Sequence, residues 1–188
     1  MASFDEMPIC LSGGAEGADL QWGMVAGSSG HKVFHFIFEG HRSRAPSSEL
    51  VVITEDLLVL ADEHLFKANE TVKRRVPSNP FVRNLLRRNW YQVKDSESVY
   101  AVSSIKVGMV DGGTAWATAM FMDRHDRTSG IPVYVYDQTT SKWFSWNGGW
   151  TATEEVPKPC GVWTGVGSRK LETNGKEAIR ELLGWKKP

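Results

Sequence analysis

The sequence predicts an α/β fold, a doubly wound, mostly parallel Rossmann-like sheet between two layers of helices. Short apolar runs alternate along the chain with longer stretches of helical periodicity, which is the order of βα units. In addition, three glycine-rich segments, 12–19, 111–116 and 165–169, each follow an apolar run and precede a predicted helix. Glycine lets backbone N–H groups approach an anion, and a helix N-terminus adds unpaired donors. The three segments together predict one phosphate-binding site at the carboxyl edge of the sheet.

The first part of the chain begins with a short strand, Pro8–Leu11, that runs into the first glycine segment. A helix over Ala18–Ala26 follows, with Asp19 in its first turn, where a carboxylate suits the helix dipole. The second strand, Val33–Phe38, is rich in aromatic and β-branched residues, and the polar loop 39–43 follows it.

Residues 51–54 fit either a strand or part of a helix, and residues 57–75 are predicted to be helical in part. The sequence Pro-Ser-Asn-Pro at 77–80 then interrupts any regular structure. Phe81–Val93 is predicted to be a helix, because its apolar residues recur at helical spacing with arginines between them.

The second half begins with a central strand, Ser98–Val102, followed by the second glycine segment and a helix over Ala115–Asp126. The next strand, Ile131–Tyr136, tolerates its proline because that residue is near the start. Residues 142–150 predict a small β-hairpin insertion around an Asn-Gly turn. This aromatic hairpin could cover the cleft, pack on the flank of the fold or form a subunit contact.

A charged connector, 154–159, leads to the last strand, Gly161–Thr164, then to the third glycine segment and a closing helix, Glu172–Gly184. We expect residues 1–188 to form a single domain, in which 161–188 is a separate strand–helix unit. Cys10 and Cys160 are expected to be buried thiols beside the paired strands, as free cysteines usually are.

Four segments at these junctions carry a resemblance to a known family: Ser12–Asp19, Arg88–Val93, Val110–Ala117 and Thr164–Arg169. With these motifs the chain resembles the SLOG superfamily of Rossmann-like domains. That group includes the YpsA-like proteins, the LOG phosphoribohydrolases and the DNA-processing protein DprA. The four segments, with the strands between them, cover most of the chain outside 40–75 and 137–160.

The order of the motifs departs from the family, in which the Gly-x-Gly-Ser-Arg turn comes first rather than last. The simplest explanation is a circular permutation, with the new ends, 183–188 and 1–7, in a helix-to-strand loop that tolerates cutting. The permutation predicts that the strand 161–164 lies beside the strand 8–11. It also predicts that all three glycine turns open on one cleft, where open α/β sheets bind ligands.

The candidate ligand-binding residues all lie in the four segments. They are Ser12, Gly13, Gly14, Ala15, Gly17, Asp19, Arg88, Gly112, Gly113, Thr114, Gly165, Gly167, Ser168 and Arg169.

Several of these candidates also have a purely structural explanation. The glycines either hold phosphate or allow tight strand-to-helix turns. Asp19 hydrogen-bonds a ribose, orders its loop or caps the helix, and Thr114 binds phosphate or caps the helix that follows. Arg169 pairs with phosphate or with Glu172, whereas Arg88 faces the cleft or lies on a solvated helix face.

An enzyme that cleaves an N-glycosidic bond needs a catalytic carboxylate, which the resemblance does not supply here. The LOG hydrolases carry Pro-Gly-Gly-x-Gly-Thr-x-x-Glu, whose glutamate acts on the N-glycosidic bond. Here that position is Ala117. The remaining carboxylates that could stabilise an oxocarbenium-like centre are Glu39, Asp19 and Asp111.

Composition limits the function classes. The 22 basic and 22 acidic residues give a net charge of zero, which argues against a nucleic-acid partner. The two cysteines form no disulfide framework and have no metal-ligand spacing. No apolar run is long enough to cross a bilayer, and the N-terminus lacks the parts of a signal peptide, so a cytoplasmic protein is expected.

Together these observations predict a domain that binds a nucleotide or a nucleotide-derived phosphate ligand, as a sensor or accessory protein, with no metal and no required cofactor. The alternative is an enzyme that cleaves or transfers at a nucleotide N-glycosidic bond. A DNA-handling role by analogy with DprA is a third hypothesis, against which the charge balance argues. The relatives imply a homo-oligomer.

Overall fold

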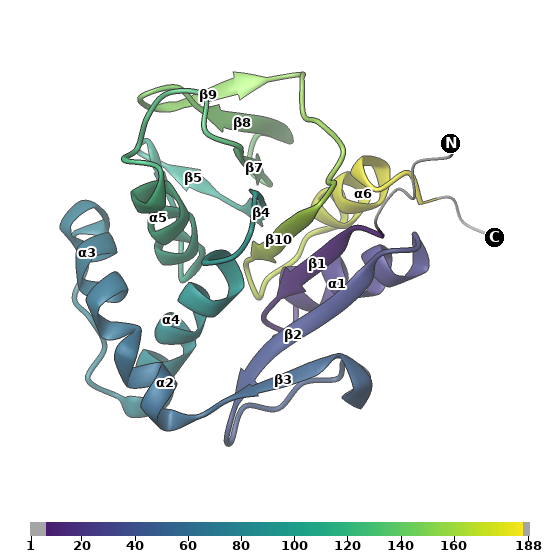
Figure 1. Ribbon diagram of the computed structural model, residues 1–188. Coiled ribbons are helices and arrows are strands. Elements are labelled where there is room, and N and C mark those ends of the chain that lie inside the picture. The colour runs from purple at the N-terminus through teal and green to yellow at the C-terminus, as the bar shows by residue number, and fades with distance from the viewer. Residues whose placement is uncertain (1–6, 186–188) are drawn as a thin grey trace, which may run out of the picture.

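The computed structural model describes residues 7–185, and it has the predicted α/β fold (Figure 1). Its main sheet has eight strands in the order β3-β2-β1-β10-β4-β7-β8-β9. The strands are β1 (Ile9–Ser12), β2 (Lys32–Phe38), β3 (Leu50–Ile53), β4 (Ser98–Ser103), β7 (Val133–Asp137), β8 (Lys142–Trp146), β9 (Trp150–Thr153) and β10 (Val162–Gly167). Neighbours from β3 to β7 pair in parallel, and β8 and β9 extend the sheet antiparallel.

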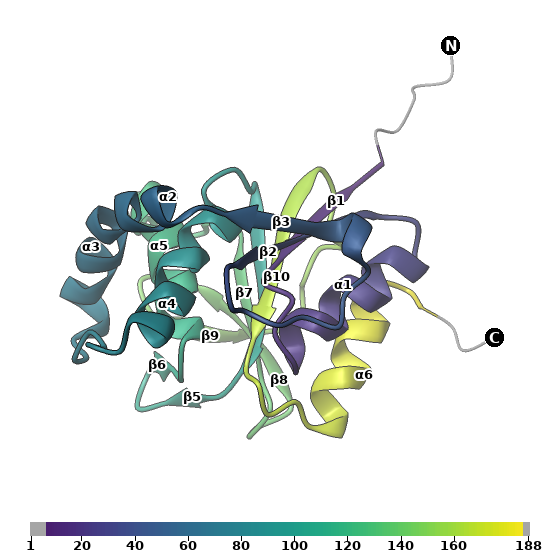
Figure 2. The ribbon, with the colours of Figure 1, turned by 90° about the horizontal axis from the view of Figure 1, so that it is seen from below.

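Helices cover both faces of the sheet, which gives the three expected layers (Figure 2). On one face lie α1 (Ala18–Ser28) and α6 (Thr173–Leu182), and on the other lie α2 (Glu55–Leu60), α3 (Asp62–Val72), α4 (Pro80–Val93) and α5 (Thr114–Arg124). A short 3₁₀ turn, η1 (Ser47–Glu49), precedes β3. A separate two-stranded hairpin, β5 (Ile105–Lys106) and β6 (Met109–Val110), stands between β4 and α5.

Each helical layer packs on its own hydrophobic cluster. Under α1 and α6, Trp22 and Trp163 are fully buried and meet edge to face with ring centroids 5.6 Å apart. The indole N–H of Trp22 donates to the carbonyl of Val166 at 3.1 Å. Because Val166 lies within β10, this packing fixes the strand that carries the third glycine segment.

The strand adjacency expected from the permuted motif order is confirmed. β1 pairs in parallel with β10, with Ile9 opposite Val162 and Leu11 opposite Thr164. The start of β1 and the end of α6 lie on the same side of the molecule in both views (Figures 1 and 2). The chain ends proper, residues 1–6 and 186–188, lie outside the described residues.

Several local expectations need correction. Residues 51–53, which fitted strand or helix, belong to β3, and Thr54 is the N-cap of α2. Residues 57–75 are helical in part, as predicted, in α2 and α3. Gly165 and Gly167 lie inside β10, not in the turn after it. Cys10 is buried as expected, but Cys160 is exposed, because β10 begins only at Val162 and the connector leaves Cys160 outside the sheet.

The aromatic hairpin β8–β9 is the flank of the fold. Trp146 and Trp150 pack against the core cluster under α5, and β8 pairs with β7. This position corresponds to flank packing, one of the three alternatives for this segment.

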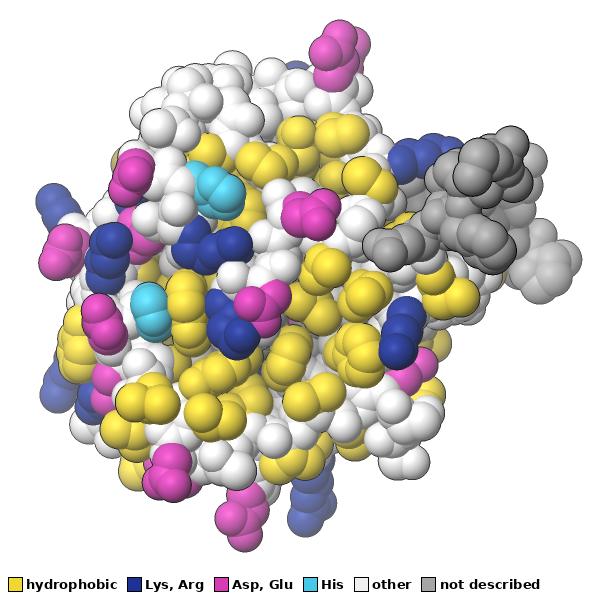
Figure 3. Space-filling view, viewed as in Figure 1, with side chains coloured by type: hydrophobic (Ala, Val, Ile, Leu, Met, Phe, Trp, Pro, Cys, Tyr) yellow, Lys and Arg dark blue, Asp and Glu magenta, His cyan; other side chains and the backbone are white. Residues whose placement is uncertain are grey.

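The surface shows no large region of one charge on the face drawn in Figure 3, where acidic and basic side chains are interspersed. Among residues 7–185, no helix combines the length and the apolar character needed to span a membrane.

Candidate functional site

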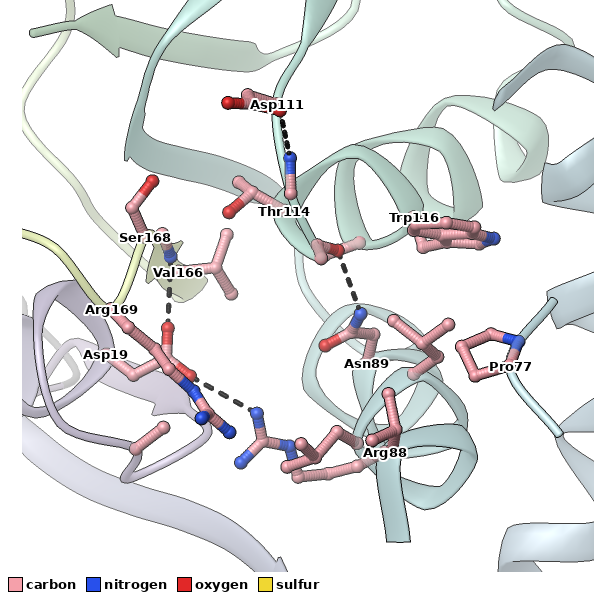
Figure 4. Close-up of a pocket in the computed structure, with 18 of the residues that line it drawn as sticks. Asp19, Pro77, Arg88, Asn89, Asp111, Thr114, Trp116, Val166, Ser168 and Arg169 are labelled. Carbon is pink, nitrogen blue, oxygen red and sulfur yellow. Dashed lines mark hydrogen bonds and ion pairs between the residues drawn. The ribbon is translucent and has the colours of Figure 1, made fainter. Parts of the chain in front are cut away.

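A cavity of about 560 Å³ opens at the carboxyl edge of the central strands. Parallel sheets of this type bind ligands at this edge, where the strand order reverses. All three glycine segments supply residues to its wall: Ala15 and Asp19 from the first, Gly112–Thr114 from the second, and Gly167–Arg169 from the third. Helix α4 closes the opposite side (Figure 4).

The first and third segments are tied to each other. The amide of Gly167 donates to the Asp19 carboxylate at 3.0 Å, and the amide of Ala18 donates to the carbonyl of Ser168 at 3.0 Å. The hydroxyl of Ser12 bonds to the carbonyls of Gly165 and Asp19. Ser12 is buried and outside the pocket wall, so its role is to hold the two segments together.

The glycines of these two segments are explained by packing. A Cβ on Gly13 would lie 2.4 Å from a carboxylate oxygen of Asp19, and one on Gly17 would lie 2.3 Å from the carbonyl oxygen of Arg169. At Gly165 the obstacle is the Trp22 ring, and at Gly167 it is the carbonyl oxygen of Val102 at 2.1 Å. Gly13, Gly14, Gly17 and Gly165 do not line the cavity. Their predicted phosphate contacts are therefore replaced by a structural role.

The second glycine segment differs because its open side faces the cavity. No atom lies within 4 Å of a Cβ on Gly112, and only a methyl of Leu86 lies near one on Gly113, at 3.7 Å. The amides of Ala115 and Trp116 bond back to Gly112 and Gly113. Within residues 7–185, the amides of Gly113 and Thr114 have no acceptor, so both donors remain for a ligand.

Two side chains fix the orientation of this turn by binding its carbonyl groups. The guanidinium of Arg74 donates to the carbonyls of Val110 and Gly112, each at 2.9 Å. The amide of Asn89 donates to the carbonyl of Gly113 at 3.2 Å. With the carbonyls of Gly112 and Gly113 engaged by side chains of the cavity wall, the N–H groups of the turn rather than these oxygens are left for a ligand. Neither Arg74 nor Asn89 is among the candidates that the sequence predicts.

Thr114 is the first residue of α5, whose cap is Gly113, and no side-chain capping bond is present. The capping alternative for Thr114 is therefore wrong. Its side chain is 5% exposed, lines the cavity and points into it (Figure 4). A hydroxyl in this position can donate to an anion bound at the amides of Gly113 and Thr114.

Arg88 faces the cavity and is 5% exposed, which decides against a solvated helix face. Its guanidinium donates to the carbonyl of Gly13 and contacts the Asp19 carboxylate at 3.4 Å. The neighbouring Arg83 and Arg87 instead pair with Asp62, away from the cavity. The single long contact with Asp19 leaves Arg88 as a buried cation that an anionic ligand would stabilise.

Arg169 is exposed and lines the cavity beside Ser168. The alternative pairing with Glu172 is wrong, because Glu172 binds Lys170 at 3.0 Å. The cavity wall carries three cations, Arg74, Arg88 and Arg169, against two carboxylates, Asp19 and Asp111. The local charge is therefore positive although the whole chain is neutral.

Of the three catalytic candidates, Asp19 and Asp111 line the cavity, but Glu39 is exposed and lies outside it. Burial raises the pKa of Asp19 to about 6, opposed by Arg88 and by the amide of Gly167. Hydrogen bonding to Lys106 lowers the pKa of Asp111. Asp19 is not a helix cap either, since α1 is capped at Gly17 without a side-chain bond.

Ala117 lines the same cavity and is 1% exposed. A glutamate in this position would add a carboxylate to the cavity wall, and alanine supplies none. In the described part of the chain, no cluster of three His, Cys, Asp or Glu side chains is arranged to hold a metal ion.

The apolar part of the wall is not among the site residues that the sequence predicts; it is formed by Pro77, Val82, Leu85, Leu86 and Trp116. One signal was available: Val82, Leu85, Leu86 and Asn89 have the spacing of a single helix face. The spacing predicts the helix but not its surroundings, because spacing alone does not distinguish a core from a cavity wall. Comparison of the chain with protein-family models, curated proteins and solved structures gave no match.

Proposed function

We propose that the protein binds a nucleotide or a nucleotide-derived phosphate ligand and acts as a sensor or accessory protein. The observation that carries this proposal is the second glycine turn. Its two unpaired amides, the start of α5 and the Thr114 side chain converge on a cavity that also contains the buried cation Arg88. Such a set of donors is suited to a phosphate group.

The motif order and the strand pairing also support a family proposal. We expect the chain to be a circularly permuted member of the SLOG superfamily. In such a chain the β10 and α6 unit takes the family's first position, next to β1. The pairing of β1 with β10 agrees with this proposal.

A binding assay with a matched pair of variants tests the proposed function. Ligand at about a hundred times its dissociation constant should stabilise the protein by roughly 2.7 kcal/mol. For a chain of this size the melting temperature should rise by about 5–10 °C. The panel contains AMP, ADP, NAD, ribose 5-phosphate and inorganic phosphate.

Thr114→Val should lower the affinity for phosphate-bearing ligands about tenfold without changing stability, because the Thr114 hydroxyl has no partner within the described residues. Thr118→Val is the control, since Thr118 lies one turn further along α5 and bonds only to helix carbonyls. Equal effects of the two variants, or no binding across the panel, would overturn the proposal.

A second candidate function is cleavage of an N-glycosidic bond, and Asp19 is the observation that favours it. This carboxyl lines the cavity, and its raised pKa of about 6 suits proton transfer near neutral pH. The position of Ala117 argues for binding instead. Release of free base from AMP by the wild type, and its loss in Asp19→Asn with binding retained, would establish the enzyme.

We also expect self-association, as the resemblance implies. Exposed apolar side chains on β3 and α2, namely Val52, Leu57, Val59 and Leu60, support this expectation. Light scattering across a concentration series measures it directly, and a monomer at all concentrations would contradict it.

A further inference from the structure

The cavity is chemically divided along its length. In Figure 4, Asp19, Ser168 and Arg169 lie at one end, Arg88, Asn89 and Thr114 in the middle, and Trp116 and Pro77 at the other end. The cavity wall also contains the apolar side chains of Val82, Leu85 and Leu86 from α4, and a methyl of Leu86 lies 3.7 Å from a Cβ built on Gly113. A ligand that fills the cavity must therefore carry an anionic part and an apolar part.

Helix α4 gives the spacing between the two parts. Its first half contributes Val82, Leu85 and Leu86 to the wall, and one turn later it contributes Arg88 and Asn89. One helical turn advances about 5.4 Å, which is close to the width of a pentose ring. The apolar residues of α4 thus begin at Leu86, beside the turn that would hold an anion, and continue to Val82, more than one helical turn away from Arg88.

Arg74, the charged side chain beside Trp116, is already engaged. Both terminal nitrogens of Arg74 donate to the carbonyls of Val110 and Gly112, and the guanidinium lies 5.6 Å from the ring centre of Trp116. In the middle of the cavity, the amide nitrogen of Asn89 is held by the carbonyl of Gly113. Among the described residues, the indole N–H of Trp116 has no partner, so it is the side-chain donor left at its end of the cavity to meet the edge of a heterocycle.

We propose that Pro77, Val82, Leu85, Leu86 and Trp116 form a subsite for a planar aromatic ring joined through a sugar to the anion. The ring is held mainly through its faces, and the one indole N–H of Trp116 can meet a ring nitrogen that all purine bases have. This inference rests on the proposed function and adds to it which part of the ligand lies where. It also predicts that the site discriminates strongly for the presence of a ring and weakly between purine bases.

Calorimetric titration of the full-length protein with AMP, GMP, IMP and ribose 5-phosphate tests the subsite. Face contacts with a base are worth about 1–3 kcal/mol, so AMP should bind at least about fivefold more tightly than ribose 5-phosphate. The three purine nucleotides should agree within about threefold. Equal affinities for AMP and ribose 5-phosphate would overturn the subsite, and a tenfold preference for one purine would overturn the binding through faces.

Val82→Ser is the principal variant, because Val82 is 40% exposed and its truncation leaves the core intact. The dissociation constant of AMP should rise about threefold to fivefold, from the loss of roughly one apolar contact group. That of ribose 5-phosphate should not change. Trp116→Leu should raise the dissociation constant of AMP by a larger factor and should likewise leave that of ribose 5-phosphate unchanged. Val59→Ser is the matched control, since Val59 is similarly exposed on α2 and lies outside the cavity.

The outcomes separate this inference from the proposed function. If Thr114→Val weakens AMP and ribose 5-phosphate alike while Val82→Ser affects neither, the phosphate site stands and the ring subsite is overturned. A loss of affinity for both ligands in Val82→Ser also overturns the subsite. If no phosphate compound binds the wild type, both proposals fail.

Discussion

The carboxylate of Asp19 accepts a hydrogen bond from the amide of Gly167 at 3.0 Å, although 148 residues separate the two in the chain. The bond connects the first turn of α1 with the end of β10. It also places a carboxylate beside Arg88 inside the cavity. One side chain thus joins two of the three glycine segments and sets the charge of the site between them.

Asp19 should make stability depend on pH in a characteristic direction. Burial raises its pKa to about 6 in the folded protein, from an ordinary value of 3.8. The folded state therefore binds more protons than the unfolded state between these values, and Asp19 stabilises the fold below about pH 4. That stabilisation is lost as the pH rises through 6.

The variant Asp19→Asn isolates this contribution. Asparagine can still accept from the Gly167 amide, but it does not titrate. The free energy of unfolding of the wild type minus that of the variant should fall by an amount on the order of 2 kcal/mol between pH 4 and pH 7. Urea unfolding of both proteins at several pH values gives this difference directly, and a flat difference would contradict the raised pKa.

Arg74 should control phosphate affinity without touching the phosphate. Its guanidinium holds the carbonyls of Val110 and Gly112, so that the amides of Gly113 and Thr114 stay directed at the cavity. In Arg74→Ala the turn is free to reorient, and the preorganised donors are lost. The affinity for AMP should fall about tenfold, from the loss of preorganised hydrogen bonding.

Arg75→Ala serves as the control for this prediction. Arg75 is the exposed neighbour in the same basic loop and does not line the cavity. The substitution Arg75→Ala removes the same charge as Arg74→Ala, at the next position in the chain. If both variants weaken AMP binding equally, the effect is one of general charge and the positioning role is wrong.

The sheet could be predicted from the sequence because its signals are local. Apolar runs bounded by glycine and proline marked the six parallel strands, apart from the ambiguous residues 51–54, and the motif order predicted the pairing of β1 with β10. The β5–β6 hairpin could not be predicted, because strands of two residues carry no periodicity. Its consequence is large, since the carbonyl of Val110 in β6 is one of the groups that Arg74 holds.

The site could be predicted only in part, because a glycine in a sequence does not show what fills the space beside it. Gly13 and Gly113 stand in similar Gly-Gly segments. Beside Gly13 the space is filled by Asp19, Arg88 and Gln92, whereas beside Gly113 it is nearly empty. Tertiary packing makes that difference, and it separates the structural turns from the one that is open to a ligand.

The two cysteines should differ sharply in reactivity. Cys10 is 0% exposed, and burial raises the pKa of its thiol, whereas Cys160 is exposed. The thiolate is the reactive form, so a disulfide reagent such as dithionitrobenzoate should modify one thiol quickly in the native protein and the second only on unfolding. Cys160→Ser should remove the fast phase, and a fast phase that persists in this variant would place Cys10 within reach of solvent.

The glycine roles can be tested by alanine substitutions. A methyl on Gly167 would lie 2.1 Å from the carbonyl oxygen of Val102 in the neighbouring strand, which cannot move without disturbing the sheet. Gly167→Ala should therefore lose about 3 kcal/mol of unfolding free energy or fail to fold. Gly113 has an ordinary φ of −65° and no close neighbour, so Gly113→Ala should be neutral or gain up to about 0.5 kcal/mol. Urea unfolding measures both changes. A severe loss in Gly113→Ala would mean that this turn is packed like the other two, and the case for an anion site at the start of α5 would fall with it.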